Sequence, residues 1–270
     1  MLENNLNNLL EPIVQTPVAP QTPTKPQTPV KPRRRSKPKS RPGRSLVIDI
    51  GGMGIKTMVL SANGKPLTKR TRVKTPRPAT PGALMNASAG LAKAQGAFDR
   101  VSVGFPGVVR RGVVVTAPNL DGNWRGLKVA EALAKKLGKP VRVANDADMQ
   151  GFGVITGHGV ELAVTLGTGF GSGLFVDGKL VPNLEIAHHP YQKGKTYEEL
   201  LGDAVRKKIG KKKWNKRLVK AIKTLERTFN YDRLYLGGGN AMRVTAKLPS
   251  NVKLVSNAAG LHGGLALWRD

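Results

Sequence analysis

Apolar residues along the chain follow two kinds of spacing, separated by glycine-rich turns. Short apolar runs typical of buried β-strands occur at LVIDI (46–50), IKTMVL (55–60), VSVGF (101–105), VVVT (113–116), VRVAN (141–145), LAVTL (162–166) and GLFVDG (173–178). Helical spacing occurs over residues 81–97, 128–137, 147–156, 197–227 and 257–268. Because the early strands are consecutive and the later ones alternate with helices, the pattern predicts an α/β fold with mixed sheets.

The same pattern predicts how the chain is divided. From about residue 16 to residue 44 the sequence consists largely of Pro, Thr, Lys and Arg, with almost nothing apolar to bury. We therefore expect residues 1–45 to form a disordered basic tail with polyproline-II character. A strand gives way to a helix near residue 145, in the middle of the remaining chain. This break predicts an N-terminal lobe over 46–145 and a C-terminal lobe over 146–270.

The net charge is the most informative feature of the composition. The 270 residues include 45 Lys and Arg against 17 Asp and Glu, a formal net charge of +28. Nine of these cations and two of the acids lie in the tail, so most of the excess belongs to the folded part. A polyanionic substrate or partner is therefore expected.

Cysteine usage and hydropathy narrow the class of protein further. The chain has no cysteine, which excludes disulfides and thiolate metal sites. No apolar run reaches the roughly 18 residues that a membrane span requires. We expect a cytoplasmic protein that does not enter a membrane.

Three glycine loops carry the first candidate chemistry. The first, DIGGMGIK (49–56), and the second, LGTGFGSG (166–173), each join two apolar strands. The third, LGGGN (236–240), follows the strand RLYL and precedes a predicted helix, whose N-terminal amides would lie near a bound anion. Glycine lets backbone N–H groups close around a phosphate, and these strand-to-strand turns differ from dinucleotide and Walker loops, which lead into helices. A plain tight turn remains an alternative for each loop, but two hairpin loops of one design favour phosphate binding. The predicted phosphate-binding residues are Gly51, Gly52, Gly54, Lys56, Gly167, Thr168, Gly169, Gly171, Gly237, Gly238 and Gly239.

A carboxylate lies between the first two loops, at the start of a predicted helix. In NDAD (145–148), Asn145 or Asp146 could simply cap that helix. Beside two phosphate loops, a carboxylate can also orient an attacking hydroxyl and accept its proton, as phosphoryl transfer to an alcohol requires. We choose Asp146 as the candidate catalytic base and expect Asp148 to face solvent in the first turn.

The ordered series of motifs resembles the ROK family of sugar kinases and repressors, and most closely its polyphosphate glucokinase branch. The resemblance covers essentially all of residues 46–270. It rests on the three glycine loops and NDAD together with GFPGVV (104–109), APNLDGNW (117–124) and EIAHH (185–189). It implies a two-lobed actin-like ATPase (ribonuclease H-like) fold around a cleft, a Mg²⁺ cofactor and a homodimer.

The resemblance also implies roles for single residues. Asp49 would approach the phosphates and the Mg²⁺ ion, and Asp146 would be the catalytic base. The implied sugar-binding residues are Asn119, Asn145, Asp146, Glu185, His188 and Glu198. Two departures are Ala187, in place of the glycine of the family's E-x-G-H element, and Met53, where a small hydroxyl residue is usual in that branch. Without cysteine, the zinc element of many relatives cannot form, so no structural zinc is expected.

A dense basic segment follows the sugar-binding motif. Residues 206–227 carry eleven Lys and Arg against one Glu. Helical spacing would turn Val205, Ile209, Leu218, Ile222 and Leu225 inward and leave the cations outside. A charge run is often only a solvated face, but this density favours screening by an extended polyanion. The predicted polyanion-binding residues are Lys207, Lys208, Lys211, Lys212, Lys213 and Lys216.

The nature of that polyanion separates the candidate functions. A linear phosphate chain fits, because lysines act as point-charge partners for phosphate. The segment lacks the interleaved aromatic residues of a base-stacking platform, although nonspecific binding to a nucleic-acid backbone stays open. The sequence therefore predicts a polyphosphate-dependent glucokinase, with inorganic polyphosphate or ATP as donor and the 6-hydroxyl of glucose as acceptor.

Three other functions remain as alternatives to this prediction. A strictly ATP-dependent ROK hexokinase differs only in the donor, and the hexose itself is not decided. A sugar-responsive regulator would carry an N-terminal helix-turn-helix, for which residues 1–45 are too rich in proline. A non-catalytic nucleic-acid-binding relative is disfavoured by the presence of Asp49 and Asp146.

Overall fold

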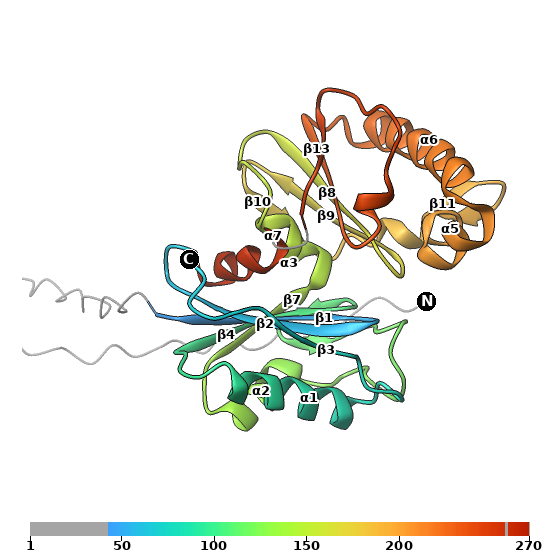
Figure 1. Cartoon of the computed structure of the whole chain (residues 1–270). Helices are drawn as coiled ribbons and strands as arrows, with labels where there is room; N and C mark the ends of the chain where they lie inside the picture. The colour runs from blue at the N-terminus through green and yellow to red at the C-terminus, as the bar shows by residue number, and fades with distance from the viewer. Residues whose placement is uncertain (1–42, 257–258, 270) are drawn as a thin grey trace, which may run out of the picture. The chain divides into compact units, whose positions relative to one another are not determined.

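Two five-stranded β-sheets of the same design form the framework of the chain (Figure 1). The computed structural model describes residues 43–256 and 259–269. The first sheet contains, in spatial order, β3 (Thr71–Val73), β2 (Gly54–Leu60), β1 (Ser45–Gly51), β4 (Arg100–Phe105) and β7 (Val141–Asn145). The second sheet contains β10 (Lys179–Val181), β9 (Phe170–Val176), β8 (Val160–Leu166), β13 (Arg233–Gly237) and β14 (Val252–Leu254).

The two sheets also share their strand directions. In each, the first two strands along the chain form an antiparallel hairpin, β1 with β2 and β8 with β9. The strands β4 and β7 run parallel to β1, and β13 and β14 run parallel to β8. The predicted α/β fold with mixed sheets is confirmed. Because the designs match, the turns of the two hairpins occupy equivalent positions in their sheets.

Two helices cover one face of the first sheet. These are α1 (Pro81–Ala94) and α2 (Val129–Leu137), whose apolar residues join the sheet in one buried core. The side chain of Thr80 caps α1 by accepting a hydrogen bond from Ala83 N, and Pro81 supplies the fixed φ suited to a first helical position. Gly138 ends α2 in the left-handed conformation that glycine adopts most readily.

A group of three helices packs on the second sheet. The helix predicted over 197–227 is divided into α4 (Tyr197–Leu201), α5 (Asp203–Ile209) and α6 (Lys211–Phe229). The breaks fall at Gly202 and Gly210, and Gly210 has a φ of +79°, outside the helical region. Of the residues predicted to face inward, Leu218, Ile222 and Leu225 are buried and Val205 and Ile209 are half-buried. The cations of α6 cover its outer side, as predicted.

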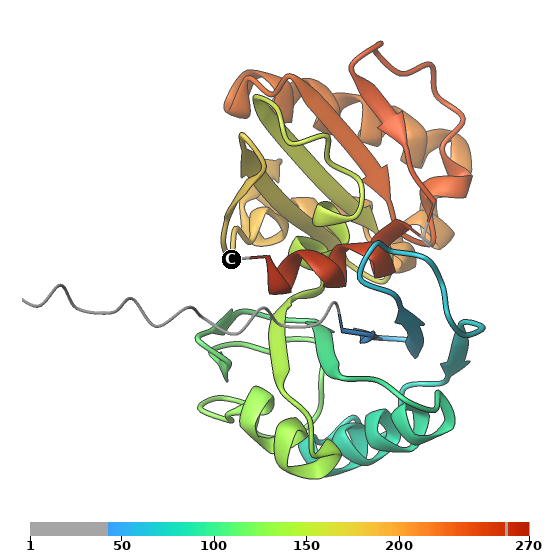
Figure 2. The same cartoon turned by 90° about the vertical axis from the view of Figure 1, so that its left-hand side faces the viewer.

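The other face of the first sheet is covered by a short helix and by the C-terminal segment (Figure 2). The short helix is α3 (Asp146–Phe152), and the segment comprises α7 (Ala259–His262) and η3 (Gly263–Trp268). A separate apolar cluster joins Val47 and Leu60 of the sheet to Met149 and Leu265. The C-terminal segment thus packs on the first sheet, and the predicted lobe boundary at residue 145 stays a prediction.

Smaller elements and the ends complete the fold. Two hairpins, β5 (Val109–Arg110) with β6 (Val113–Val114) and β11 (Pro190–Gln192) with β12 (Lys195–Thr196), lie outside the main sheets. The predicted tail lies, up to residue 42, outside the described residues. Within the described ranges, no helix combines the length and hydropathy needed to cross a bilayer.

Candidate active site

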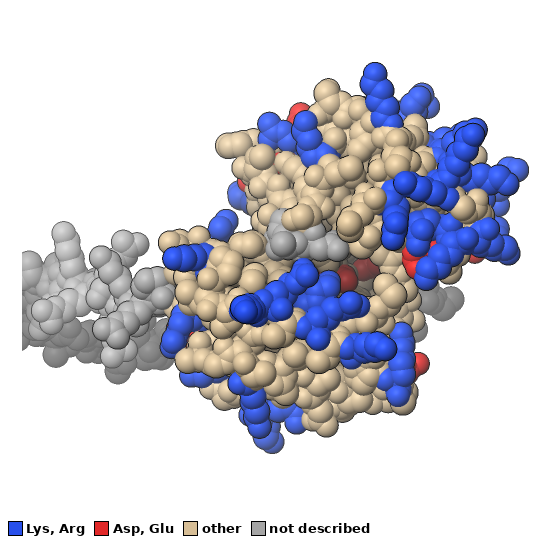
Figure 3. Space-filling model, viewed as in Figure 1, with Lys and Arg blue, Asp and Glu red and all other residues tan. Residues whose placement is uncertain are grey.

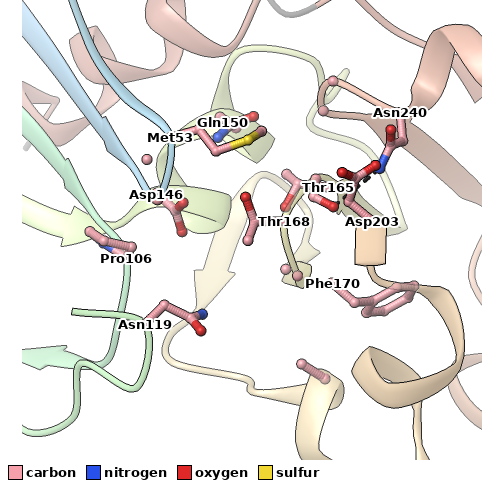
Figure 4. Close-up of a pocket in the computed structure, with 18 of the residues that line it drawn as sticks. Met53, Pro106, Asn119, Asp146, Gln150, Thr165, Thr168, Phe170, Asp203 and Asn240 are labelled. Atoms are coloured by element: carbon pink, nitrogen blue, oxygen red, sulfur yellow. Dashed lines mark hydrogen bonds between the residues drawn. The ribbon is translucent and has the colours of Figure 1, made fainter. Parts of the chain in front are cut away.

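A cavity of about 570 Å³ lies where the hairpin turns of the two sheets approach one another. Every predicted sugar-binding residue lines it, and so does every predicted phosphate-binding residue except Gly237. Among the predicted polyanion-binding lysines, only Lys207 lines it. In Figure 4, Asp146 and Thr168 point toward one another across this cavity, with Asn119 to one side. The structure therefore brings together motifs that are up to 190 residues apart in the chain.

The first two glycine loops face each other across the cavity. The first forms the turn between β1 and β2, and the second forms the turn between β8 and β9. A Cβ added at Gly52 would lie 3.6 Å from Thr168 Oγ1, so the two turns are separated by little more than a van der Waals contact. Backbone donors from both sheets can therefore act on one bound group.

The third glycine loop braces the second. Gly238 has a φ of +85°, and an added Cβ there would collide with the carbonyl oxygen of Leu166. Asn240 N donates to the same carbonyl at 2.8 Å, and Asn240 Nδ2 donates to the carbonyl of Gly167 at 3.1 Å. The segment that follows, η2 (Ala241–Arg243), is a single 3₁₀ turn. The expectation that a helix N-terminus follows this loop is therefore wrong.

Gly171 has a packing reason that the sequence did not suggest. It lies inside β9, and the turn itself is limited to residues 167–169. A Cβ added at Gly171 would come within 2.9 Å of the Ala147 Cβ atom and would collide with Thr165 Oγ1. Glycine at this position lets α3 pack closely against the second sheet.

Asp49 and Lys56 form an ion pair at the base of the first loop. They are partners in the register of β1 and β2, and Lys56 Nζ lies 2.7 Å from Asp49 Oδ2. Asp49 is only 5% exposed, yet its second oxygen, Oδ1, has no hydrogen-bond partner. A buried carboxylate oxygen without a partner is costly, and it suits a hard cation such as Mg²⁺. The described residues hold no cluster of three or more His, Cys, Asp or Glu, so donor phosphates and water would supply the other ligands.

Asn145 and Asp146 divide between them the two roles proposed for NDAD. Asn145 Oδ1 accepts hydrogen bonds from Ala147 N at 2.8 Å and Asp148 N at 3.1 Å, so Asn145 is the helix cap. The half-buried Asp146 carboxylate is left to face the cavity (Figure 4). Burial, reinforced by the nearby charge of Asp49, raises the pKa of Asp146 to about 8.

The expectation that Asp148 faces solvent is wrong. Asp148 is 2% exposed, because α3 is covered on this side by β9 and by the loop after β10. Its Oδ2 atom accepts a hydrogen bond from Asn183 N at 3.3 Å, and its Oδ1 atom has no partner. Burial raises the pKa of Asp148 to about 7.

The predicted sugar-binding motif lies in the loop after β10. Asn145 Nδ2 donates to Glu185 Oε1 at 3.3 Å and to the carbonyl of Gly107 at 3.2 Å. His188 Nε2 lies 4.0 Å from Glu185 Oε2, and burial raises the pKa of Glu185. Glu198, from α4, lies against the second glycine loop, where a Cβ on Gly169 would collide with its carboxylate. These groups form the end of the cavity nearest Asp146.

Asn183 ties this loop to the first-sheet side of the cavity. It has a φ of +61°, a conformation that asparagine tolerates better than most residues. Its side-chain oxygen accepts a hydrogen bond from Val109 N at 3.2 Å, while its own N–H donates to Asp148. Asn183 was not predicted from the sequence, because a lone Asn in a VPN turn carries no signal for a long-range contact.

The opposite end of the cavity is basic. Asp203 there accepts hydrogen bonds from Lys207, Arg206 and Asn240, which lower its pKa to about 2. Figure 3 shows Lys and Arg side chains gathered over α5 and α6 and on the facing rim of the hollow, with acidic atoms deep inside it. Four of the cations that line this end were not among the predicted site residues, and they are Arg70, Arg72, Arg206 and Arg243.

Comparisons with known proteins identify relatives of this chain. The sequence profile of the ROK family matches residues 45–185. A polyphosphate glucokinase from Mycobacterium tuberculosis is 32% identical over 212 residues, which cover 75% of this chain and 80% of that protein. The solved inorganic polyphosphate/ATP-glucomannokinase from Arthrobacter sp. strain KM has a TM-score of 0.76 at 32% identity and covers 83% of this chain and 97% of its own.

A second solved structure bears on the fold alone. The ROK family glucokinase from Streptomyces griseus, solved with glucose and AMPPNP, has a TM-score of 0.70 at 20% identity and covers 83% of this chain. Together these neighbours confirm the predicted actin-like fold with mixed sheets. By the profile match and the identity to a relative over most of both sequences, the chain belongs to the ROK family.

Proposed function

We propose that this chain is a polyphosphate-dependent glucokinase, which transfers a phosphoryl group from inorganic polyphosphate to the 6-hydroxyl of glucose. Its relatives named polyphosphate glucokinase and polyphosphate/ATP-glucomannokinase support a sugar phosphotransferase. The observation that carries the choice of donor is the charged lining of one end of the cavity. The polar groups at the end of the cavity nearest Asp146, called here the acceptor end, support phosphoryl transfer to a sugar hydroxyl.

The acceptor end offers polar groups that suit a sugar. Asn119, Glu185 and His188 would hold hydroxyl groups, and Glu198 lies beside the second glycine loop. Asp146 would then orient the attacking hydroxyl and accept its proton. A base is most effective when its pKa lies near the working pH, and the pKa of Asp146, about 8, meets that condition.

The donor phosphates would lie between the first two glycine loops. Backbone N–H groups around Gly52 and Gly169 and the hydroxyl of Thr168 are the donors that this region offers. A bound Mg²⁺ ion, held by Asp49, would neutralise phosphate charge there. Lys56 is paired with Asp49 and would hold that carboxylate in place.

Beyond the loops, the lining favours a phosphate chain over an adenine ring. Binding pockets for flat organic rings are lined mostly by aliphatic and aromatic side chains. Here Met53 and Phe170 line the cavity as well, but seven of the lining residues at this end are charged or polar. Five of them are cations and one is an acid. They are Arg70, Arg72, Asp203, Arg206, Lys207, Asn240 and Arg243.

The basic surface of α5 and α6 extends this lining outward. Lys208, Lys211, Lys212, Lys213 and Lys216 are exposed, and none of them lines the cavity. A chain that carries about one negative charge per phosphate could pass from the cavity onto this surface. ATP remains the alternative donor, and the homodimer implied by the family stays a prediction.

The decisive experiment measures glucose 6-phosphate formed by purified protein with Mg²⁺ and long-chain polyphosphate, ATP or neither. Product with polyphosphate supports the proposal, and product with ATP alone contradicts the choice of donor. An Asp146→Asn variant serves as the chemical control, because loss of a general base typically lowers kcat by roughly 10²–10⁴-fold. Glucose binding by this variant should be retained.

A charge-reversal pair tests the basic surface separately. Changing Lys208, Lys211, Lys212 and Lys216 to Glu should raise KM for long-chain polyphosphate much more than KM for ATP. The matched control reverses four exposed lysines elsewhere, which are Lys65, Lys69, Lys179 and Lys253. Equal effects of the two sets would mean that only the overall net charge matters.

A further inference from the structure

The first glycine loop is held from outside by a neighbouring segment. Three consecutive peptide carbonyls of the loop each accept a hydrogen bond from a side chain in residues 72–77. The bonds run from Thr75 Oγ1 to the carbonyl of Gly51 (2.6 Å), from Arg77 Nη2 to that of Gly52 (3.0 Å) and from Arg72 Nη2 to that of Met53 (3.3 Å).

These bonds fix the direction of the loop amides. A trans peptide is planar, so the N–H of one residue points opposite to the carbonyl of the residue before it. With the carbonyls of Gly51 and Gly52 drawn toward residues 72–77, the N–H groups of Gly52 and Met53 point the other way. All of these loop residues line the cavity, and Gly52 is the one that faces Thr168 of the second loop.

The three side chains are themselves held in place. Thr75 is buried, and the guanidinium of Arg77 also lies 3.5 Å from Asp121 Oδ2. Asp121 in turn accepts a hydrogen bond from Ala79 N at 2.6 Å. Arg72 covers Gly54 so closely that an added Cβ would lie 2.5 Å from its Nε atom. Burial therefore fixes Thr75, and Asp121 gives Arg77 a second contact that orients it.

We propose that Thr75, Arg77 and Arg72 are positioning residues for the phosphoryl donor. They hold the first glycine loop with its amides turned toward the donor, and Arg72, which also lines the cavity, adds positive charge there. Met53 makes this support more important, because without a side-chain hydroxyl at this position the loop depends on its backbone donors. The proposal rests on the proposed function only in taking a phosphate donor to bind at this loop.

The test compares variants that remove one bond each. Thr75→Val keeps the shape of the side chain and loses the donor, while Thr75→Ser keeps the donor. Because one hydrogen bond contributes about as much as a fivefold change in affinity, Thr75→Val should raise the donor KM roughly fivefold, and Arg77→Met, which also removes a charge, by roughly tenfold or more. KM for glucose should stay unchanged, and Thr75→Ser should restore the donor KM.

A matched control lies in the same segment. Lys74 is exposed, carries the same charge as Arg77 and is not among the residues that line the cavity. Lys74→Met should leave the donor KM within twofold of the unaltered protein. If Arg77→Met behaves like Lys74→Met, or if both Thr75 variants lower the melting temperature without changing the donor KM, the proposal is overturned.

A binding measurement separates this proposal from the choice of donor. Calorimetric titration with tripolyphosphate and Mg²⁺, without glucose, reports on the loop without turnover. If polyphosphate is not a substrate but ATP is, the same KM comparison is made with ATP, and the proposed function fails while the positioning roles are still tested. Unchanged tripolyphosphate affinity in both Thr75→Val and Arg77→Met would refute the roles, whichever donor is used.

Discussion

Lys56 and Asp49 face each other across the paired strands β1 and β2, with 2.7 Å between the ammonium Nζ and the carboxylate Oδ2. The pair lies directly below the first glycine loop, and Asp49 is almost completely buried. The lysine therefore compensates one oxygen of a carboxylate whose other oxygen is unpartnered. This arrangement keeps a charged carboxylate inside the protein at a lower cost than an isolated carboxylate would have.

Replacing Lys56 should reveal how much its ion pair with Asp49 contributes to the free energy of unfolding. Lys56→Met leaves the buried Asp49 charge without its partner, and breaking a buried ion pair typically costs roughly 3–5 kcal/mol. Lys56 is partly exposed, so we expect a loss near or below the lower limit. The free energy of unfolding, measured by denaturant titration, should fall by this amount. Lys65→Met, at an exposed site, is the control, and an equal loss in the two variants would contradict the explanation.

The raised pKa of Asp146 predicts the pH dependence of turnover. The base must be deprotonated to accept a proton, so kcat/KM for glucose should rise with pH through about 8. Asp49 and Glu185 both raise this pKa by charge repulsion. Mg²⁺ bound beside Asp49, or a Glu185→Gln change, should therefore move the rising limb to lower pH. A profile that is flat between pH 6 and 9 would exclude Asp146 as the titrating base.

Sequence reasoning identified the cavity but not what shapes it. Motifs with glycines and carboxylates carry a local signal, and all three glycine loops, Asp146 and Glu185 reach one cavity. The short strands β3 and β14 were missed, because three residues in a strand leave no periodicity to detect. Site residues were missed for a similar reason, which is that they leave no local signal in the sequence. Thr75 and Asn183 act through single hydrogen bonds to distant backbone, and only the three-dimensional register creates those contacts.

The buried Asp148 predicts that the folded protein loses stability as pH rises. Its pKa is about 7 in the folded protein against an ordinary value near 3.8, so its contribution to stability is fully present below pH 3.8 and is lost as pH rises through 7. Asp148→Asn keeps an acceptor for Asn183 N and cannot ionise. Between pH 4 and 8, the free energy of unfolding of the variant should rise above that of the unaltered protein by up to a few kcal/mol, measured by denaturant unfolding. If the free energy of unfolding changes with pH in the same way in both proteins, burial does not raise the pKa of Asp148.

Asn183 should affect glucose binding without touching glucose. Its bond to Val109 N holds the loop that carries Glu185 against the first-sheet side of the cavity. Asn183→Gly permits the same left-handed backbone but removes the acceptor, and loss of one hydrogen bond, about 1 kcal/mol, should raise KM for glucose roughly fivefold. Asn183→Asp retains an acceptor and should restore KM, whereas KM for the donor should be the same in all three proteins. If the glycine variant binds glucose normally, or if KM for both substrates rises together, the loop is not positioned by this bond.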